Sequence, residues 1–404
     1  MDRGEDIMMH NPKLAQGVYA VGAVDWTMRS FHGYETPRGI TYNAYLIVDE
    51  KVCLIDTVKA PFAKELLERI RQIIDPALID YIVCNHTEPD HSSALPAIME
   101  QAPQAKVVLT AQGKESIIKH YRKEYDFQVV KEGDVLDLGC NKLHFLTMSM
   151  LHWPDSMASY LDGEEILFSN DAFGQHIATN QRFDDENKLS DIMHEASKYY
   201  ANILLPYNRL IGKALGKTET VPIKMIAPSH GVIWRKHITD ILAKYEQWGN
   251  AYHNDSIVIV YDSMWGATED IARRILEGAS AAGSTVKLHR LTTSPLSEIM
   301  NDILEAGGVM IGSSTQHNDV LATVGGFLTY LKGLRPVNKI GAAFGAYGWA
   351  GGAMKTLEQA MTDTGITVAS PGLAFKWVAD PKGQEQCFNF GLEFAKKVQE
   401  NKNK

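Results

Sequence analysis

The segment His86-Thr87-Glu88-Pro89-Asp90-His91 carries the densest chemical signal in the 404-residue chain. It follows an apolar run at residues 81–84 that is typical of a buried strand. Two imidazoles and two carboxylates fall within six residues, and solvated turns rarely bring four potential metal ligands so close together. Because Pro89 opposes a helix, we expect a loop at the end of the strand to present these groups to a pair of metal ions.

Three further candidate ligands also stand at the ends of apolar runs. The runs lie at 143–148, 166–168 and 225–227, and the residues that follow them are His152, Asp171 and His230. Polar side chains in loops on a rigid sheet are where functional sites are usually built. Each of these residues alone would more often be a cap or a surface group, so their combination with the segment 86–91 is what favours a metal centre.

The composition describes a globular protein of two to three domains. The chain is 45% hydrophobic and 22% charged, and 40 basic against 49 acidic residues give a net charge of −9. This balance argues against a basic surface, spread over the whole protein, that binds nucleic acid or an anionic membrane. No apolar run approaches the roughly 18 residues of a membrane span, and the polar start of the chain has no signal-peptide pattern. We therefore expect a cytoplasmic protein.

The pattern of apolar and polar residues changes at residues 248–255, a polar and turn-rich stretch. Before it, short alternating apolar runs mix with helical spacing, as expected for an α/β domain over residues 1–250. After it, apolar strands alternate with amphipathic helices, which predicts a doubly wound parallel sheet in residues 251–404. The expected strands lie at 256–261, 286–291, 308–312, 340–344 and 366–369.

The first strand of the second domain leads into Ser263-Met264-Trp265-Gly266-Ala267-Thr268 and then a helix. The hydroxyls of Ser263 and Thr268, with the amides of a helix N-terminus, favour a phosphate group. The sequence has neither a G-x-x-x-x-G-K-[ST] loop nor a G-x-G-x-x-G fingerprint, so the segment predicts a mononucleotide rather than ATP or NAD. The alternative is a hydroxyl-rich helix cap without a ligand.

Two later strand ends are expected to complete the mononucleotide site. They are Ser313-Ser314-Thr315-Gln316-His317-Asn318 and Ala346-Tyr347-Gly348-Trp349. In a doubly wound sheet, ligands bind beyond the carboxyl ends of the strands, so both segments should flank one crevice. Trp265, Tyr347 and Trp349 offer flat surfaces for an aromatic ring system.

The motif at 86–91, with the later His, Asp and His, resembles the metallo-β-lactamase signature H-x-H-x-D-H, except that Glu88 stands at the second His position. Because a flavodoxin-like phosphate loop follows at 259–268, nearly the whole chain resembles the flavodiiron protein family. This resemblance implies an N-terminal αββα metallo-β-lactamase-like sandwich with a non-haem di-iron centre. It also implies a C-terminal flavodoxin-like domain that binds FMN.

The resemblance assigns a role to each of the seven candidate ligands. One iron would be held by His86, Glu88 and His152, the other by Asp90, His91 and His230, with Asp171 as the bridge between them. Four neutral imidazoles and three carboxylates carry a charge of −3, which with one bridging hydroxide balances two divalent ions. Carboxylate oxygens suit iron, whereas structural zinc favours closed sets of Cys and His. For His91 the alternative is a ring turned away, with water in its place.

Such a centre implies an oxidoreductase that reduces dioxygen to water, nitric oxide to nitrous oxide, or both. Two electrons from a di-ferrous pair and two from reduced FMN make four, the number that converts one dioxygen into two waters. The expected catalytic residues are Asp171 and His91 at the irons and His32 as a nearby proton donor. His176 and one of the two tyrosines Tyr199 and Tyr200 would line the same pocket.

The expected partners follow from what the sequence lacks. It has no rubredoxin-like cysteine pairs and no dinucleotide fingerprint, so an external donor must supply electrons, either a rubredoxin-type protein or a reduced deazaflavin. The resemblance implies a head-to-tail homodimer or a dimer of dimers, and neither nucleic acid nor a membrane is an expected partner. Two other functions stay open: a zinc-dependent hydrolase with a regulatory flavodoxin-like domain, and an electron carrier with a degenerate metal fold.

Overall fold

The computed structural model describes residues 10–218 and 221–402, which form two compact units. The first unit comprises the described residues up to Phe31, together with Thr36–Tyr199 and Arg209–Glu246. The second comprises His32–Glu35, Tyr200–Asn208 and the described residues from Gln247 onward. Two short segments that the sequence pattern placed in the first domain therefore group with the second unit.

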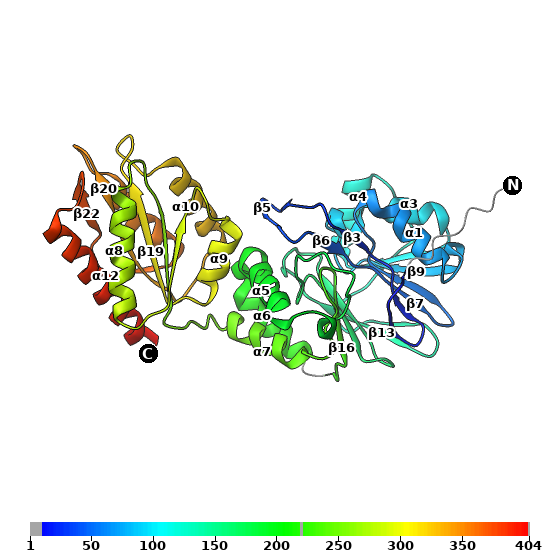
Figure 1. Ribbon diagram of the computed structural model, residues 1–404. Helices are drawn as coiled ribbons and strands as arrows, with labels where there is room; N and C mark the ends of the chain where they lie inside the picture. The colour runs from blue at the N-terminus through cyan, green and yellow to red at the C-terminus, as the bar shows by residue number, and fades with distance from the viewer. Residues whose placement is uncertain (1–9, 219–220, 403–404) are drawn as a thin grey trace. The chain divides into compact units, whose positions relative to one another are not determined.

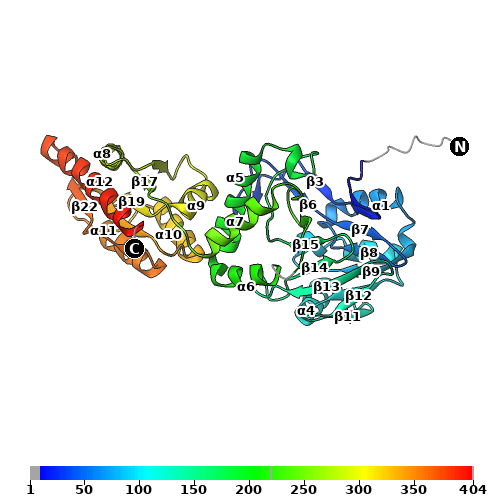
Figure 2. The ribbon, with the colours of Figure 1, turned by 90° about the horizontal axis from the view of Figure 1, so that it is seen from below.

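The first unit contains two stacked sheets (Figures 1 and 2). The seven-stranded sheet has the order β1 (Lys13–Ala15), β2 (Val18–Ala20), β7 (Tyr45–Val48), β8 (Val52–Ile55), β9 (Ile79–Val83), β10 (Lys106–Leu109) and β11 (Phe127–Val129). The five-stranded sheet has the order β12 (Val135–Asp137), β13 (Lys142–Thr147), β14 (Met157–Leu161), β15 (Ile166–Asn170) and β16 (Met225–Pro228). Strands β8 to β11 run parallel to one another, as do β15 and β16.

The core of this unit lies between the two sheets. Tyr45 and Val83 from the seven-stranded sheet pack there against Phe145 and Phe168 from the five-stranded sheet. Helices cover the two outer faces: α1 (Ala63–Arg71), α3 (Leu95–Gln101) and α4 (Ala111–Tyr121) on the first sheet, α6 (Asn208–Thr218) and α7 (Ile238–Gly249) on the second. The expected αββα sandwich is therefore confirmed.

The ligand-rich segment after β9 is not a loop throughout. Residues Pro89–Ser92 form a short helix, α2, so the expectation of a loop is wrong for the second half of the motif. Pro89 lies in the first turn of α2, where backbone amides have no hydrogen-bond acceptor within the helix. A residue without an amide hydrogen therefore costs no hydrogen bond there, and the fixed φ of proline suits the helix. His86 and Glu88 lie in the loop before α2, whereas Asp90 and His91 lie within it.

The second unit is built on a doubly wound parallel sheet, as expected. Its strands have the order β18 (Val286–Arg290), β17 (Ile257–Asp262), β19 (Gly308–Ser314), β20 (Ile340–Tyr347) and β21 (Thr367–Val368), and β22 (Leu373–Lys376) also pairs with β20. All these pairs are parallel. The helices of one face are α8 (Ala267–Ala281) and α12 (Pro381–Lys402), and those of the other are α9 (Leu296–Glu305), α10 (Ala322–Leu334) and α11 (Ala353–Thr364) (Figures 1 and 2).

The edge of this sheet differs from the prediction of one strand at 366–369. β21 pairs with the start of β20, and β22 pairs with its end, so two short strands continue one another along the same edge. Pro371 lies in the break between them and has no amide hydrogen to donate to the ladder.

Helices of both units pack apolar side chains into buried cores. In α1, for example, Leu66, Leu67 and Ile70 are buried on one face. Within residues 10–218 and 221–402, no helix is long and apolar enough to cross a bilayer.

Candidate metal centre

All seven candidate ligands lie in segments that follow strands of the first unit. His86, Glu88, Asp90 and His91 follow β9, His152 follows β13, Asp171 follows β15, and His230 follows β16. The seven-stranded sheet and the five-stranded sheet each supply part of the set. The strand ends therefore bring together side chains that are up to 144 residues apart in the sequence, from His86 to His230.

Four of these side chains, His86, Glu88, His152 and Asp171, form one cluster whose ligand atoms all lie within 4.8 Å of one another. Glu88 Oε2 is 3.2 Å from Nε2 of His86 and 3.2 Å from Nε2 of His152. Asp171 Oδ2 is 3.1 Å from His152 Nε2 and 3.7 Å from His86 Nε2. Two imidazole nitrogens and two carboxylate oxygens therefore converge on one small volume, a mixed donor set that suits iron.

The second cluster consists of Asp90, His91 and His230. Asp90 Oδ2 is 3.1 Å from His230 Nε2 and 3.5 Å from His91 Nε2. The other oxygen of Asp171, Oδ1, lies 3.2 Å from His91 Nε2 and 3.5 Å from His230 Nε2. Asp171 therefore faces both clusters, one oxygen to each, and the ring of His91 is turned toward the site rather than away from it.

The donor atoms of both clusters have the unmet bonding capacity that cations would satisfy. The carboxylate oxygens of Asp90 and Asp171 and both ring nitrogens of His91 are buried and form no well-aligned hydrogen bond within the described residues. Burial by itself lowers the pKa of His86, but the carboxylates around it, first Asp155 and then Glu88, outweigh burial and raise this pKa to about 10. Buried carboxylates without compensating charge are strongly destabilising. A pair of metal ions therefore fits the residues present.

Hydrogen bonds behind the clusters hold two of the histidine rings in place. His230 Nδ1 donates to the carbonyl oxygen of Thr41 at 2.6 Å, which leaves Nε2 as the free acceptor. Asp155 Oδ2 lies 3.1 Å from His86 Nδ1 and also accepts hydrogen bonds from the amide and the hydroxyl of Thr87, each at 2.7 Å. Such outer partners fix the tautomer and the orientation of a metal-binding imidazole.

Sequence reasoning missed Asp155. It stands three residues after His152 and is 3% exposed, although a carboxylate after a Trp-Pro pair would ordinarily be a solvated turn residue. The signal available in the sequence was its place in the same strand-end segment as a candidate ligand. Its contact with His86, 69 residues away, depends on the fold.

We expect Asp155→Asn to weaken iron binding by roughly 10- to 100-fold, because the amide is a poorer acceptor for the His86 ring. The measurement is the iron retained during titration with a chelator, with circular dichroism to confirm the fold. Asp126→Asn is the matched control, because Asp126 is exposed in the same unit. Identical chelator titrations for the two variants would contradict this role.

Aromatic rings line the second cluster on the side of His230. The ring centroid of His176 lies 5.3 Å from that of His230 and 4.9 Å from that of Tyr199. Tyr200 instead packs against Trp248 at 5.0 Å. Of the two tyrosines, Tyr199 is therefore the one beside the predicted pocket.

His32 is the other residue that the sequence predicts near the irons. It is exposed in the turn between β4 (Ser30–Phe31) and β5 (Tyr34–Glu35), with a φ of 50°. Its segment groups with the second unit. Its role as a proton donor at the irons stays a prediction.

The predicted phosphate loop lies between β17 and α8. Ser263 Oγ accepts a hydrogen bond from the amide of Gly266 at 3.1 Å, and Gly266 has a φ of 89°, which glycine adopts readily. Thr268 Oγ1 lies 3.0 Å from Ser314 Oγ, which also accepts from the amide of Met264 at 3.3 Å. The first two predicted segments therefore meet at Ser314.

The remaining predicted flavin residues divide between loop scaffolding and surface. The buried Ser313 hydroxyl donates to the carbonyl of Ser314 at 2.8 Å and accepts from the amide of Leu321 at 3.0 Å, so it shapes the loop. The amide of Thr315 donates to the carbonyl of Ala346 at 2.9 Å, which joins the second segment to the third. Positive φ values of 50° at His317 and 62° at Asn318 form the tight turn that follows Gln316.

Large exposed aromatic side chains stand on these loops. Trp265 is 93% exposed and Trp349 is 87% exposed, as a surface that contacts a ligand or partner would be in the isolated chain. Sequence reasoning missed Trp377, whose ring centroid lies 6.2 Å from that of Trp349 and whose amide donates to the carbonyl of Tyr347 at 2.7 Å. Its only sequence signal was a tryptophan directly after β22, a strand that was not predicted.

An αββα sandwich with two adjoining clusters of buried candidate metal ligands, followed by a flavodoxin-like sheet with the predicted phosphate loop, is the architecture of an oxidoreductase that uses metal and flavin together. Comparisons with known families agree with this class. Residues 40–231 match the family model described as ODP family beta lactamase, and residues 259–391 match the flavodoxin model. A protein of Moorella thermoacetica named nitric oxide reductase is 46% identical over 95% of this chain and 98% of its own length.

Further relatives and solved structures point to the same family. The anaerobic nitric oxide reductase flavorubredoxin of Escherichia coli is 41% identical over 94% of this chain and 81% of its own. Rubredoxin oxygen:oxidoreductase from Desulfovibrio gigas superimposes with a TM-score of 0.95 at 40% identity, covering 97% of this chain and 99% of its own. The flavodiiron protein from Giardia intestinalis superimposes with a TM-score of 0.96 at 34% identity, covering 98% of each chain.

The chain therefore belongs to the flavodiiron protein family. Its cofactors are FMN and a non-haem di-iron centre.

Proposed function

We propose that the chain is an oxidoreductase that reduces dioxygen to water, nitric oxide to nitrous oxide, or both, with electrons relayed through FMN. The observation that carries the proposal is the placement of Asp171, whose two oxygens face the two ligand clusters. A carboxylate shared in this way holds two metal ions close enough to act on one small molecule. The names of the Moorella and Desulfovibrio relatives support both substrates.

The proposed ligand assignment follows the two clusters. His86, Glu88 and His152 would hold one iron, Asp90, His91 and His230 would hold the other, and Asp171, which faces both clusters, would be shared between them. The inward orientation of the His91 ring, 3.2 Å from Asp171 Oδ1, supports its place among the ligands.

Residues around the irons set the conditions for the reaction. When bound, the irons and FMN supply the electrons that the reduction consumes. Asp155 and the Thr41 carbonyl fix the rings of His86 and His230, so each presents Nε2 to the site. His176 and Tyr199 close the His230 side with aromatic surface and exclude water there. We assign to these two side chains, together with His32, the delivery of protons.

The proposed flavin site uses the loops after three strands of the second unit. The segment 263–268 with Ser314 would hold the phosphate, and Tyr347 and Trp349 would offer flat surfaces to the isoalloxazine ring. At Gly348 a Cβ atom would come within 2.9 Å of the ring of Trp377, so glycine lets this loop lie close to that ring.

We further propose a head-to-tail homodimer in which electrons pass from the FMN of one chain to the irons of the other. The family resemblance supports it, as does the connection between the domains, because residues 250–256 alone separate α7 from β17. An external donor of the rubredoxin type supplies the electrons, a proposal supported by the name of the Desulfovibrio relative.

Glu88→His should shift the metal preference from iron toward zinc and lower gas reduction, because it removes a carboxylate and one negative charge from the first cluster. Metal analysis after loading with equal iron and zinc measures the preference. Glu88→Gln is the control, since it removes the charge without adding an imidazole. Unchanged iron loading and turnover in Glu88→His would show that Glu88 does not set the metal.

Elemental analysis with a flavin spectrum tests the proposed function directly. We expect about two irons and one FMN per chain, from seven ligands for a metal pair and one flavodoxin-like site. Anaerobic stopped-flow mixing of the reduced protein with each gas then ranks dioxygen against nitric oxide. Two zinc ions, no redox response and hydrolytic activity would instead establish the zinc hydrolase, and a flavin without metal would establish the electron carrier.

A further inference from the structure

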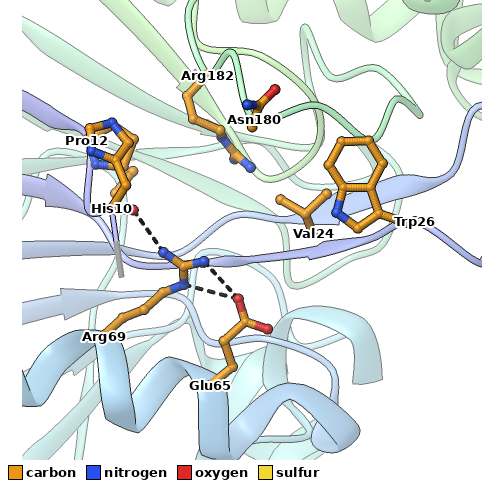
Figure 3. Close-up of a pocket in the computed structure, with 10 residues that line it drawn as sticks. His10, Pro12, Val24, Trp26, Glu65, Arg69, Asn180 and Arg182 are labelled. Atoms are coloured by element: carbon orange, nitrogen blue, oxygen red, sulfur yellow. Dashed lines mark hydrogen bonds and ion pairs between the residues drawn. The ribbon is translucent and has the colours of Figure 1, made fainter. Parts of the chain in front are cut away.

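A separate pocket of about 350 Å³ opens on the first unit, and none of its lining residues belongs to the proposed iron or flavin sites (Figure 3). Strand β2, strand β3 (Ala23–Asp25), helix α1 and the segment 180–182 form its walls. Volumes of this size are typical of sites for small organic molecules. The pocket therefore has room for a ligand of its own.

Two arginines face this pocket, and of the two only Arg69 forms an ion pair with a described residue. Arg69 pairs with Glu65, whose Oε1 lies 2.8 Å from Nη2 and 3.1 Å from Nε, and its Nη1 donates to the carbonyl of His10 at 2.9 Å. Figure 3 shows this network on one wall and the Arg182 side chain reaching in from the opposite wall. Within the described residues, Arg182 forms no ion pair with a carboxylate. Two guanidiniums and one carboxylate leave the wall with a net charge of +1.

The Arg182 side chain is held in position, but its hydrogen-bonding capacity is only partly used. It is 7% exposed, and its Nη2 donates to Asn43 Oδ1. Its Nε has no hydrogen-bond partner among the described residues. Asn43 is itself fixed, because its Nδ2 donates to the carbonyls of Pro228 at 2.8 Å and Gly231 at 3.1 Å. A buried guanidinium fixed by an amide and lacking an anion has the chemistry of an anion site.

The rest of the wall is apolar. Figure 3 places Val24 and Trp26 beside the two arginines, and Trp26 is 55% exposed. Pro12 and Ala20 extend this surface. An inorganic anion would leave this apolar wall facing water, whereas an organic anion with an apolar or aromatic body would cover it.

We propose that this pocket binds a small organic monocarboxylate, with the carboxylate on Arg182 and the apolar body against Val24 and Trp26. One negative charge matches the net charge of the wall, and a planar carboxylate matches the donor geometry of a guanidinium. The site is independent of the proposed gas reduction, so it can exist whether or not that function is correct.

The test uses the holoenzyme and three probes: benzoate, benzamide and inorganic phosphate. We expect isothermal titration calorimetry to detect benzoate binding, with benzamide and phosphate each at least about tenfold weaker, because the first lacks the charge and the second the apolar body. No heat with benzoate, or equal binding of either other probe, would overturn the proposal.

Two variants locate the binding. Arg182→Met should weaken benzoate binding at least about tenfold, and Val24→Trp should abolish it by filling the pocket while leaving Arg182 in place. Arg71→Met on the exposed side of α1 is the control, since it removes the same charge outside the pocket. Equal losses for Arg71→Met and Arg182→Met would show non-specific attraction and overturn the site. Val24→Trp decides the matter if Arg182→Met fails to fold, since retained affinity there contradicts the proposal.

Discussion

An Asp171→Ala variant is expected to lose most of its iron and nearly all gas reduction while it keeps its FMN. Both clusters lose a donor at once, because Oδ2 of Asp171 is 3.1 Å from His152 Nε2 and Oδ1 is 3.2 Å from His91 Nε2. Removing an outer partner of a metal ligand typically costs 10- to 100-fold, so losing a shared ligand should lower turnover by more than about 100-fold. The flavin should stay bound because the proposed phosphate loop belongs to the other compact unit.

Elemental analysis, the flavin absorbance and anaerobic single-turnover kinetics measure the three parts of this expectation. Asp126→Ala, an exposed carboxylate of the same unit, is the control and should behave as the wild type. Full iron loading with normal turnover in Asp171→Ala would remove Asp171 from the centre. Simultaneous loss of FMN would show that the two sites do not fold independently.

The sequence could predict which side chains gather at the centre because each candidate ligand ends an apolar strand. Strands of a stacked pair of sheets end at a common edge, so residues as distant as His86 and His230 meet there. The flavodoxin-like sheet could be predicted equally well, since strictly alternating buried strands and amphipathic helices are compatible with few topologies. Local chemistry at strand ends therefore carried most of the prediction.

What the sequence could not reveal depends on contacts across the fold. Asp155 became a partner of His86 only because β9 and β13 belong to sheets that face one another. Pro89 reads as a helix breaker in isolation, yet it begins α2 because the first turn of a helix tolerates proline. Trp377 follows β22, a strand that was not predicted, and it lies beside Trp349 because that strand pairs with β20.

Mixing two inactive variants should restore activity if electrons cross between chains. Asp171→Ala keeps the flavin but loses the irons, and Thr268→Asp keeps the irons but loses the flavin, since its carboxylate would stand at the proposed phosphate position. Thr268 Oγ1 lies 3.0 Å from Ser314 Oγ in the proposed phosphate loop, so a carboxylate at this position would repel a phosphate group. In the proposed head-to-tail dimer, a mixed pair holds one FMN from the first chain beside one iron centre from the second.

Random pairing would make half of the dimers mixed, each with one working site of two, so roughly a quarter of wild-type turnover should return after subunit exchange. Native mass spectrometry reports the exchange, and oxygen or nitric oxide consumption reports the activity. Thr268→Ser, which keeps the hydroxyl, is the control and should retain FMN and full activity. A relay within one chain predicts no recovery at all, because neither variant then holds both cofactors. Confirmed exchange without recovered activity would therefore place the relay inside the single chain and overturn the cross-chain dimer.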